Sequence, residues 1–426
     1  PFTCSIDRKG FHPMTTKTTT QTPFWKRAIV VLALGWVVIW ISRMMLTPIY
    51  SVLSEFFGGV SNAQLGLISS FYFLGYVIMQ IPSGILVDRF GMKAVVIPGF
   101  IVFAVGTVII ALSGTLEMLY AGSLISGAGC GTFFGIAYTI TNVYVPGDKK
   151  SLATAIVNSG TAVGSGLGLV SASCLVSTGL LPWQTLAAST AVLAVVMAVV
   201  FARTLPGQKK AAAPATIEQK LDSAAPGKNG LGKLFKPQMI AAYIVYFSTL
   251  YMYYLISTWL PNFLGTERGF ADSLTGIVSS LVFFAGIPGA LIFSRIADKM
   301  PTKKVPLIVG LELIASVFAL VMIQSTNQTV VVAGIVAYGF FGKLTVEPII
   351  ISWLGQFAPK GSVTTMFGVF NFFGMSASVV APTVTGSLTD SLGSGVWGFY
   401  LAILIILVGT AAFLVIDRVC ASRARA

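Results

Sequence analysis

The sequence predicts an all-α integral membrane protein with twelve transmembrane helices, arranged as two pseudo-symmetric bundles of six. Three observations predict this fold class. Only 10% of the 426 residues are charged and 55% are apolar, with a mean hydropathy of +0.86, whereas a soluble surface needs far more charge. The apolar residues form successive runs of about 20 residues or more, the length that crosses about 30 Å of hydrocarbon. A short charged signature also recurs in the two halves of the chain, which indicates duplication.

The apolar runs give the order of the expected spans. In the first half we expect spans at 28–50, 64–87, 94–113, 116–142, 151–177 and 182–202. In the second half we expect them at 238–263, 272–297, 304–325, 328–356, 363–389 and 396–416. The polar stretch between the halves is rich in Pro, Gly and Ala, a composition typical of a flexible linker. The predicted domains are an N-terminal tail (1–27), an N-terminal bundle (28–203), a linker (204–236), a C-terminal bundle (237–417) and a C-terminal tail (418–426).

The placement of charge predicts orientation. The net charge is +13, and if the N-terminus is cytoplasmic the expected outer loops carry Arg268 as their one basic residue. Such asymmetry follows the positive-inside rule. We therefore expect a multi-pass protein of the cell inner (plasma) membrane with both termini in the cytoplasm. The basic excess then reflects topology and not a nucleic-acid surface.

Residues of the kind that carry enzyme chemistry are sparse. The single histidine, His12, lies in the polar tail, and the four cysteines are split between spans and tails, so neither a metal cluster nor a disulfide framework is indicated. The glycine-rich stretches 127–129 and 164–168 lie within apolar spans and lack the following Lys-Ser or Lys-Thr of a phosphate loop. Close helix packing explains them better. We expect no enzyme activity, no cofactor and no metal.

The repeated signature lies between the second and third spans of each half. The first copy reads GILVDRFGMK from Gly84 to Lys93, and the second reads SRIADKMPTK from Ser294 to Lys303. Aligning Asp88 with Asp298 also aligns Arg89 with Lys299. Gly84 can let helices approach closely, Asp88 can bind a positive helix N-terminus, and Arg89 can pair with an acid such as Asp148. Gly91 then provides the turn of the signature. A charged loop that serves only topology is the alternative.

These residues carry a resemblance. The first copy resembles the cytoplasmic loop motif of the major facilitator superfamily, and the twelve-span layout is similar over the whole chain. This resemblance implies the major facilitator fold, transport by alternating access, and a role for the loop residues in latching a cytoplasmic gate. A narrower resemblance, to the organic anion:cation symporters of that superfamily, rests on SNAQLGL at 61–67, QIPSG at 80–84, NSG at 158–160, and GVFN at 368–371 with Pro382.

The chain departs from that narrower pattern in the first and fourth spans. Ser42 stands where many of these symporters have an acid, and the fourth span carries no acid. Ser123 stands where many superfamily members have a basic residue. The Gly-Pro signature of antiporters is also absent from 160–168, which disfavours a drug exporter.

Four ionisable residues fall well inside the expected spans: Arg43, Glu312, Lys343 and Glu347. Each is costly in hydrocarbon unless it faces a cavity or a partner, so each is a candidate functional residue. The matching symporters have an arginine at the position of Arg43 that grips a substrate carboxylate, and a guanidinium can do so with two parallel hydrogen bonds. The alternative is an arginine that snorkels to the outer interface.

Lys343 and Glu347 are four residues apart, so they share one helix face. In the superfamily the tenth span lines the central cavity, which makes Lys343 a second anion-binding cation and Glu347 a candidate for the coupling proton. A purely structural ion pair is the alternative. Pro348 weakens the helix there and is a candidate hinge. Glu312, in the peripheral ninth span, is also a proton-coupling candidate, although a structural hydrogen bond to a neighbouring helix explains it better.

Tyrosines and amides supply the remaining candidates for substrate binding. A tyrosine can donate to a carboxylate without adding charge, and an amide can bind a ligand or another helix. Packing or lipid contact is the alternative for the aromatic residues. The candidates are Tyr72 and Tyr76 in the second span, Tyr246 and Tyr253 on one face of the seventh, and Tyr138, Asn158 and Asn371 in the fourth, fifth and eleventh.

Two cations, one in each half, favour an anionic cargo. We expect a monomeric secondary active transporter that takes up a small organic anion with protons, the anion being a mono- or dicarboxylate or a sugar acid that bridges Arg43 and Lys343. The alternatives are an anion exchanger or an exporter of another small molecule. A non-transporting membrane sensor is disfavoured, because nothing in 204–236 resembles a signalling domain.

Overall fold

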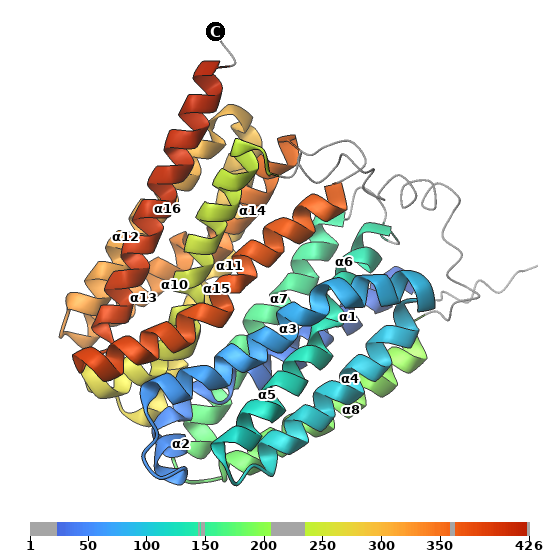
Figure 1. Ribbon diagram of the computed structural model, residues 1–426, viewed down its shortest axis with the longest axis vertical. Coiled ribbons are helices and arrows are strands. Elements are labelled where there is room, and N and C mark those ends of the chain that lie inside the picture. The colour runs from blue at the N-terminus through green and yellow to red at the C-terminus, as the bar shows by residue number, and fades with distance from the viewer. Residues whose placement is uncertain (1–23, 144, 146–149, 206–234, 358–362, 424–426) are drawn as a thin grey trace, which may run out of the picture.

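The computed structural model describes residues 24–143, 145, 150–205, 235–357 and 363–423. Within these ranges, twelve helical segments are long and apolar enough to cross a membrane, and strands are absent (Figure 1). The predicted fold class is therefore confirmed. Most of the predicted linker and nearly all of the N-terminal tail lie outside the described residues, so the predicted domain limits remain predictions.

The N-terminal bundle contains the first six spans. The first span is interrupted near its end, and the fifth ends in a π-helical turn, Ala172–Val176. The elements are α1 (Phe24–Met44), a short 3₁₀ turn (Thr47–Ile49), α2 (Tyr50–Phe56), α3 (Asn62–Phe90), α4 (Met92–Ala111), α5 (Leu116–Gly131), α6 (Phe133–Val143), α7 (Lys150–Ser171) and α8 (Trp183–Thr204).

The C-terminal bundle contains the other six spans. Every predicted span is present with ends shifted by a few residues, because the length of each apolar run sets the length of its helix. The elements are α10 (Pro237–Arg268), α11 (Asp272–Lys299), α12 (Lys304–Gln324), α13 (Gln328–Phe341), α14 (Lys343–Leu354), α15 (Val363–Leu392) and α16 (Val396–Arg423).

The fourth and tenth spans are each built from two helices. The interruptions fall at Thr132 and Gly342, which are separated by the same number of residues as Asp88 and Asp298, so they belong to the internal repeat. Gly342 adopts φ −80° and ψ −148°, outside the helical region. The hydroxyl of Thr345 donates to the carbonyl of Phe340 at 2.7 Å and so satisfies a group that the break leaves without a helical partner.

The tenth span breaks at Gly342, a position that we did not predict. In this structure α14 continues through Pro348, which stays a candidate hinge. A proline removes one helical hydrogen bond, which neighbouring groups can replace in a membrane helix. The non-helical backbone of Gly342 ends the helix altogether.

Glycines allow the helices of the N-terminal bundle to pack closely. A Cβ atom at Gly127 would collide with the backbone carbonyl of Tyr72, and Cβ atoms at Gly160, Gly164 and Gly168 would collide with the backbone of α1. The glycine-rich stretches of α5 and α7 are therefore helix-packing surfaces, as predicted.

The two bundles are joined by hydrogen bonds at one end. We call the end where α8 stops and α10 starts the linker end, and the opposite end the loop end. Among the described residues, hydrogen bonds between the bundles link Ser70 to Thr383 (2.8 Å), Ser173 to Thr275 (3.3 Å) and the start of α3 to Asp390. All of them lie toward the loop end, whereas the bundles diverge toward the linker end (Figure 1).

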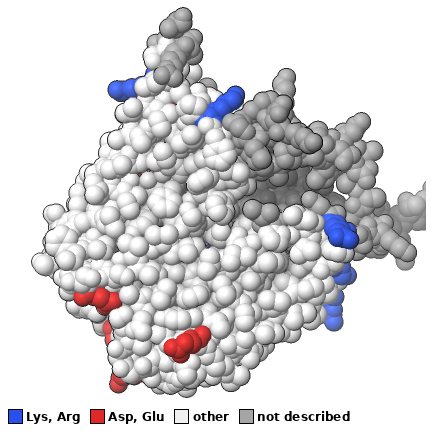
Figure 2. Space-filling model, viewed as in Figure 1, with Lys and Arg blue, Asp and Glu red and all other residues white. Residues whose placement is uncertain are grey.

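Basic and acidic side chains also lie at opposite ends of the molecule. Figure 2 shows Lys and Arg at the linker end of the viewed face and Asp and Glu at the loop end, with an uncharged belt between them. An uncharged belt between two charged rims is what a bilayer-spanning surface requires.

Candidate functional site

Arg43 lies inside an aromatic cluster at the end of α1. Arg43 is only 7% exposed. Its guanidinium carbon lies close to four ring centroids, those of Trp40 (4.4 Å), Phe73 (4.6 Å), Tyr76 (4.8 Å) and Tyr72 (5.1 Å). The structure thus brings together Arg43 and both predicted tyrosines of α3. The guanidinium is enclosed by rings instead of reaching the outer surface.

Two of the three guanidinium nitrogens of Arg43 lack hydrogen-bond acceptors. Its Nε and Nη2 atoms have no hydrogen-bond partner, and among the described residues no carboxylate lies within ion-pair distance. Ring faces attract a cation by about 0.5–2 kcal/mol, but they do not accept these N–H groups as an oxygen would. The site therefore presents a buried cation that has two free donors and, among the described residues, no carboxylate partner.

A small cavity adjoins Arg43. It measures about 20 Å³, room for about one water molecule. Three serines line it together with Arg43: Ser42, Ser69 and Ser123. The two positions at which the sequence departs from the symporter pattern, Ser42 and Ser123, therefore meet beside the arginine. The absence of an acid at position 42 helps to leave the arginine unpaired.

A second charged group lies in the C-terminal bundle. Lys343 is the first residue of α14, and its Nζ lies 2.7 Å from Oε2 of Glu347. Tyr246 donates its hydroxyl to Oε1 of Glu347 at 2.5 Å, and Lys343 lies 4.9 Å from the ring centroid of Tyr253. The four residues predicted from the seventh and tenth spans are thus in contact. Tyr246 also stacks on Phe370 of α15 at 4.0 Å.

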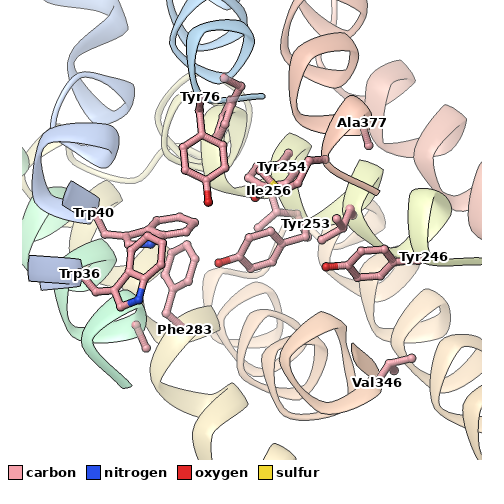
Figure 3. Close-up of a cluster of buried hydrophobic side chains, with 14 of the residues drawn as sticks. Trp36, Trp40, Tyr76, Tyr246, Tyr253, Tyr254, Ile256, Phe283, Val346 and Ala377 are labelled. Atoms are coloured by element: carbon pink, nitrogen blue, oxygen red, sulfur yellow. Dashed lines mark hydrogen bonds between the residues drawn. The ribbon is translucent and has the colours of Figure 1, made fainter. Parts of the chain in front are cut away.

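Aromatic rings connect the two charged groups. Phe73, which contacts Arg43, packs edge-on against Tyr254 at 4.6 Å across the boundary between the bundles. Tyr254 packs against Tyr253 at 5.3 Å, and Tyr253 contacts Lys343. Figure 3 shows Trp40 and Tyr76 facing Tyr253 and Tyr254 within this cluster. Arg43 and Lys343 therefore belong to one continuous aromatic site built by both bundles.

Other predicted site residues lie elsewhere. Glu312 is buried between α12 and α10, where Thr249 donates a hydrogen bond to its carboxylate, the kind of bond expected for a structural role. Asn371 is partly buried beside Phe370, and Asn158 is exposed on α7. The side chain of Tyr138 lies outside the described residues.

The repeated loop signature lies at the linker end. Gly91, with φ 83°, separates α3 from α4, and Asp298 and Lys299 are exposed at the end of α11. Among the described residues, no atom would lie within 4 Å of a Cβ at Gly84, so none of the described helices makes the close approach expected there. Arg89 lies near the ring of Phe90, at 5.3 Å, and Lys93 is partly buried, whereas Asp148 and the side chain of Asp88 lie outside the described residues.

Comparison with known families decides the classification. The sequence model of the Major Facilitator Superfamily matches residues 32–382. The chain belongs to the major facilitator superfamily. Superfamily membership makes it a transporter-type protein and not an enzyme, and its relatives place it near the organic-anion members.

Two curated superfamily relatives and one solved structure illustrate the similarity. The D-galactonate transporter of Escherichia coli O6:H1 is 22% identical over 91% of this chain and 94% of its own. The 4-hydroxybenzoate transporter of Pseudomonas aeruginosa is 26% identical over 77% of this chain and 79% of its own. A bacterial homologue of the human lysosomal transporter Spinster, in an inward-facing and occupied conformation, is 15% identical, with a TM-score of 0.71 over 93% of this chain and 98% of that one.

Several residues of this site are not predicted from the sequence. Trp40 and Phe73 contact Arg43, Cys130 lies 3.1 Å from the hydroxyl of Tyr72, and Tyr254 joins the bundles. Trp40 could have been found, because it lies one turn before Arg43 on the same helix face. Cys130 and Tyr254 could not, because their contacts depend on how separate helices pack.

Proposed function

We propose that this protein is a secondary active transporter that takes up a small organic anion together with protons by alternating access. The observation that carries the proposal is the guanidinium of Arg43, a buried cation whose Nε and Nη2 donors have no hydrogen-bond partner. Such a cation is costly in a membrane protein unless it serves a function. A substrate carboxylate supplies the missing charge and the missing acceptors together.

The pair of Lys343 and Glu347 supplies the coupling in this proposal. An anion that reaches Lys343 competes with Glu347, which keeps the hydrogen bond from Tyr246. A carboxylate that loses its cation partner inside the membrane binds a proton more readily. Substrate and proton then enter together. Because Arg43 and Lys343 belong to different bundles, an anion that bridges them also favours closure of the two bundles around it.

The proposed mechanism assigns a state to this arrangement of helices. With the basic linker end in the cytoplasm, contact at the loop end and divergence at the linker end correspond to an inward-facing conformation. The signature around Asp88 and Asp298 then acts as a cytoplasmic latch that engages in the opposite state. In this proposal the protein works as a monomer in the cell inner (plasma) membrane.

Transport assays in proteoliposomes test the proposal. An imposed proton gradient should drive saturable accumulation of an organic anion, and a proton-conducting uncoupler should abolish accumulation but not counterflow. If uptake depends on a second anion on the opposite side and ignores the gradient, the protein is an exchanger. Saturable uptake of a cation or an uncharged solute without any response to organic anions contradicts the proposal.

A further inference from the structure

We infer that the anion selected by this site carries its carboxylate on a flat aromatic body and not on a polyhydroxylated chain. The inference rests on the proposed function, since it names the class of anion that Arg43 would bind. It is carried by two features of the site: a row of unpaired donors on α1, and the ring surfaces that surround it.

The row of donors follows one face of α1. Trp36, Trp40 and Arg43 are spaced four and three residues apart, so they lie on the same side of the helix. Their exposed fractions are 3%, 7% and 7%. The indole nitrogens of Trp36 and Trp40 and the Nε and Nη2 atoms of Arg43 all lack hydrogen-bond partners. Indole and guanidinium groups only donate. The row therefore fits a ligand that presents acceptors: a carboxylate at one end and oxygen substituents farther along.

Ring surfaces flank this row on both sides. Tyr76 approaches it from the N-terminal bundle, and Tyr253, Tyr254 and Phe283 approach it from the C-terminal bundle (Figure 3). Tyr253 and Phe283 are only 4% and 1% exposed. Aromatic rings bind another ring by offset stacking or edge-on contact in addition to burying its apolar area. The body of the ligand thus meets ring faces and edges from both bundles.

A polyhydroxylated anion fits this lining poorly. Each of its hydroxyls must donate a hydrogen bond as well as accept one, and a donor left without an acceptor weakens binding. The carboxylate of Glu347 already accepts from Lys343 and Tyr246, and the hydroxyl of Ser69 is paired with that of Tyr50. The hydroxyl of Ser42, which has no partner, and the amide of Asn371, beside Phe370, can accept as well, but the indole and guanidinium donors that line α1 cannot, so a chain of hydroxyls finds fewer acceptors here than donors.

Relatives of both kinds exist, so sequence similarity does not decide between them. One is described as a 4-hydroxybenzoate transporter and another as a D-galactonate transporter, at 26% and 22% identity. The lining of the site makes the distinction. The lining favours the aromatic acid, because four unpaired donors and many ring faces match an aromatic carboxylate that carries an oxygen substituent on its ring.

Counterflow in proteoliposomes with three probes tests the inference. The signal of protein-free vesicles is subtracted for each probe. The probes are 4-hydroxybenzoate, D-galactonate and 4-hydroxybenzyl alcohol, which keeps the ring but lacks the carboxylate. We expect saturable counterflow of 4-hydroxybenzoate at a concentration at least about tenfold lower than that needed for D-galactonate, and none for the alcohol. Absence of saturable 4-hydroxybenzoate counterflow overturns the inference. If D-galactonate alone is carried, organic-anion transport stands and the aromatic preference fails. If the alcohol alone is carried, the proposed function fails as well.

Substitutions at Trp40 test the role of the lining. Trp40→Leu removes the ring beside Arg43 and should raise the half-saturating concentration of 4-hydroxybenzoate at least about tenfold. Trp40→Phe keeps a ring but loses the indole donor, so it should have a smaller effect and should reduce the quenching of tryptophan fluorescence by 4-hydroxybenzoate. Trp397→Leu, at a 49%-exposed position on α16, is the matched control and should change neither value. Unchanged affinity and unchanged quenching in folded Trp40→Phe overturn the inference, even if Trp40→Leu does not fold.

Discussion

Asp390 near the end of α15 caps the beginning of α3 through Asn62. The carboxylate accepts hydrogen bonds from the backbone N–H of Asn62 (2.9 Å), from its side-chain amide (2.9 Å) and from the backbone N–H of Ala63 (2.8 Å). An acid of one bundle thus occupies the positive N-terminus of a helix in the other. A Cβ at Gly386 would collide with the backbone of Asn62, so the two helices touch here. This contact helps to hold the loop end closed.

Asp390→Asn should loosen the loop end. The amide keeps one oxygen but loses the charge that favours the helix N-terminus, an effect of about 0.3–1 kcal/mol in addition to any lost hydrogen bond. Spin labels at the exposed positions Leu112 and Leu392 should report a larger population of long distances. Glu117→Gln, which removes an exposed acid in the first turn of α5, is the control. An identical distance distribution in Asp390→Asn and the control contradicts a latch at this contact.

Lys343→Met should weaken substrate binding more than it affects folding. The substitution removes the cation but keeps an apolar side chain beside Tyr253, while Glu347 keeps its bond to Tyr246. Loss of a charged contact to a carboxylate costs about 2–3 kcal/mol, so KM for anion counterflow should rise about 30- to 150-fold. Lys236→Met, at an exposed position outside the repeated loop signature, provides the control. A KM within about threefold of the wild-type value would leave Lys343 with a purely structural role.

Glu347→Gln should separate substrate movement from proton movement. The amide can still accept from Tyr246 but cannot take up a proton and become neutral in the transport cycle. Accumulation driven by a proton gradient should fail, and counterflow should survive. Both are measured in the same proteoliposomes. Gradient-driven accumulation that persists in this variant assigns the coupling proton to another group.

Gly342→Ala should slow the transport cycle. A Cβ at this position would lie 2.6 Å from the carbonyl oxygen of Tyr338, so the break between α13 and α14 must shift to accommodate it. Overpacking of this kind costs about 1–3 kcal/mol. We expect a lower maximal rate and a lower melting temperature. Gly310→Ala is the control, since no described atom lies within 4 Å of its Cβ position. Equal rates in the two variants would show that the geometry at Gly342 is unimportant for transport.

The sequence predicts the scaffold of this protein well because apolar length and charge placement are local properties. It also predicts which ionisable residues lie inside the spans, since each is a charged residue within an apolar run. The break at Gly342 is harder to predict, because its stability depends on the bond between Thr345 and Phe340. The contact of Asp390 with Asn62 joins helices far apart in the chain, and nothing in either local sequence indicates it.

The aromatic enclosure of Arg43 shows the same limit. Tyr72 and Tyr76 were predicted as site residues, but whether their rings face the guanidinium depends on the rotation of α3 against α1. Close packing of glycines on α5 against α3, such as Gly127 against Tyr72, helps to set that rotation. Composition reveals the aromatic residues, and only packing reveals that they surround one cation.

Binding and counterflow of an organic anion in Arg43→Gln test the central claim most directly. Glutamine keeps a polar side chain but removes the charge and the paired donors, whereas Arg203→Gln removes an exposed arginine at the end of α8. We expect Arg43→Gln to reach the membrane folded, with a melting temperature near that of the control, and to lose saturable counterflow and ligand-induced thermal stabilisation. Normal half-saturation and normal stabilisation in Arg43→Gln would contradict the account of Arg43 as the carboxylate-binding residue.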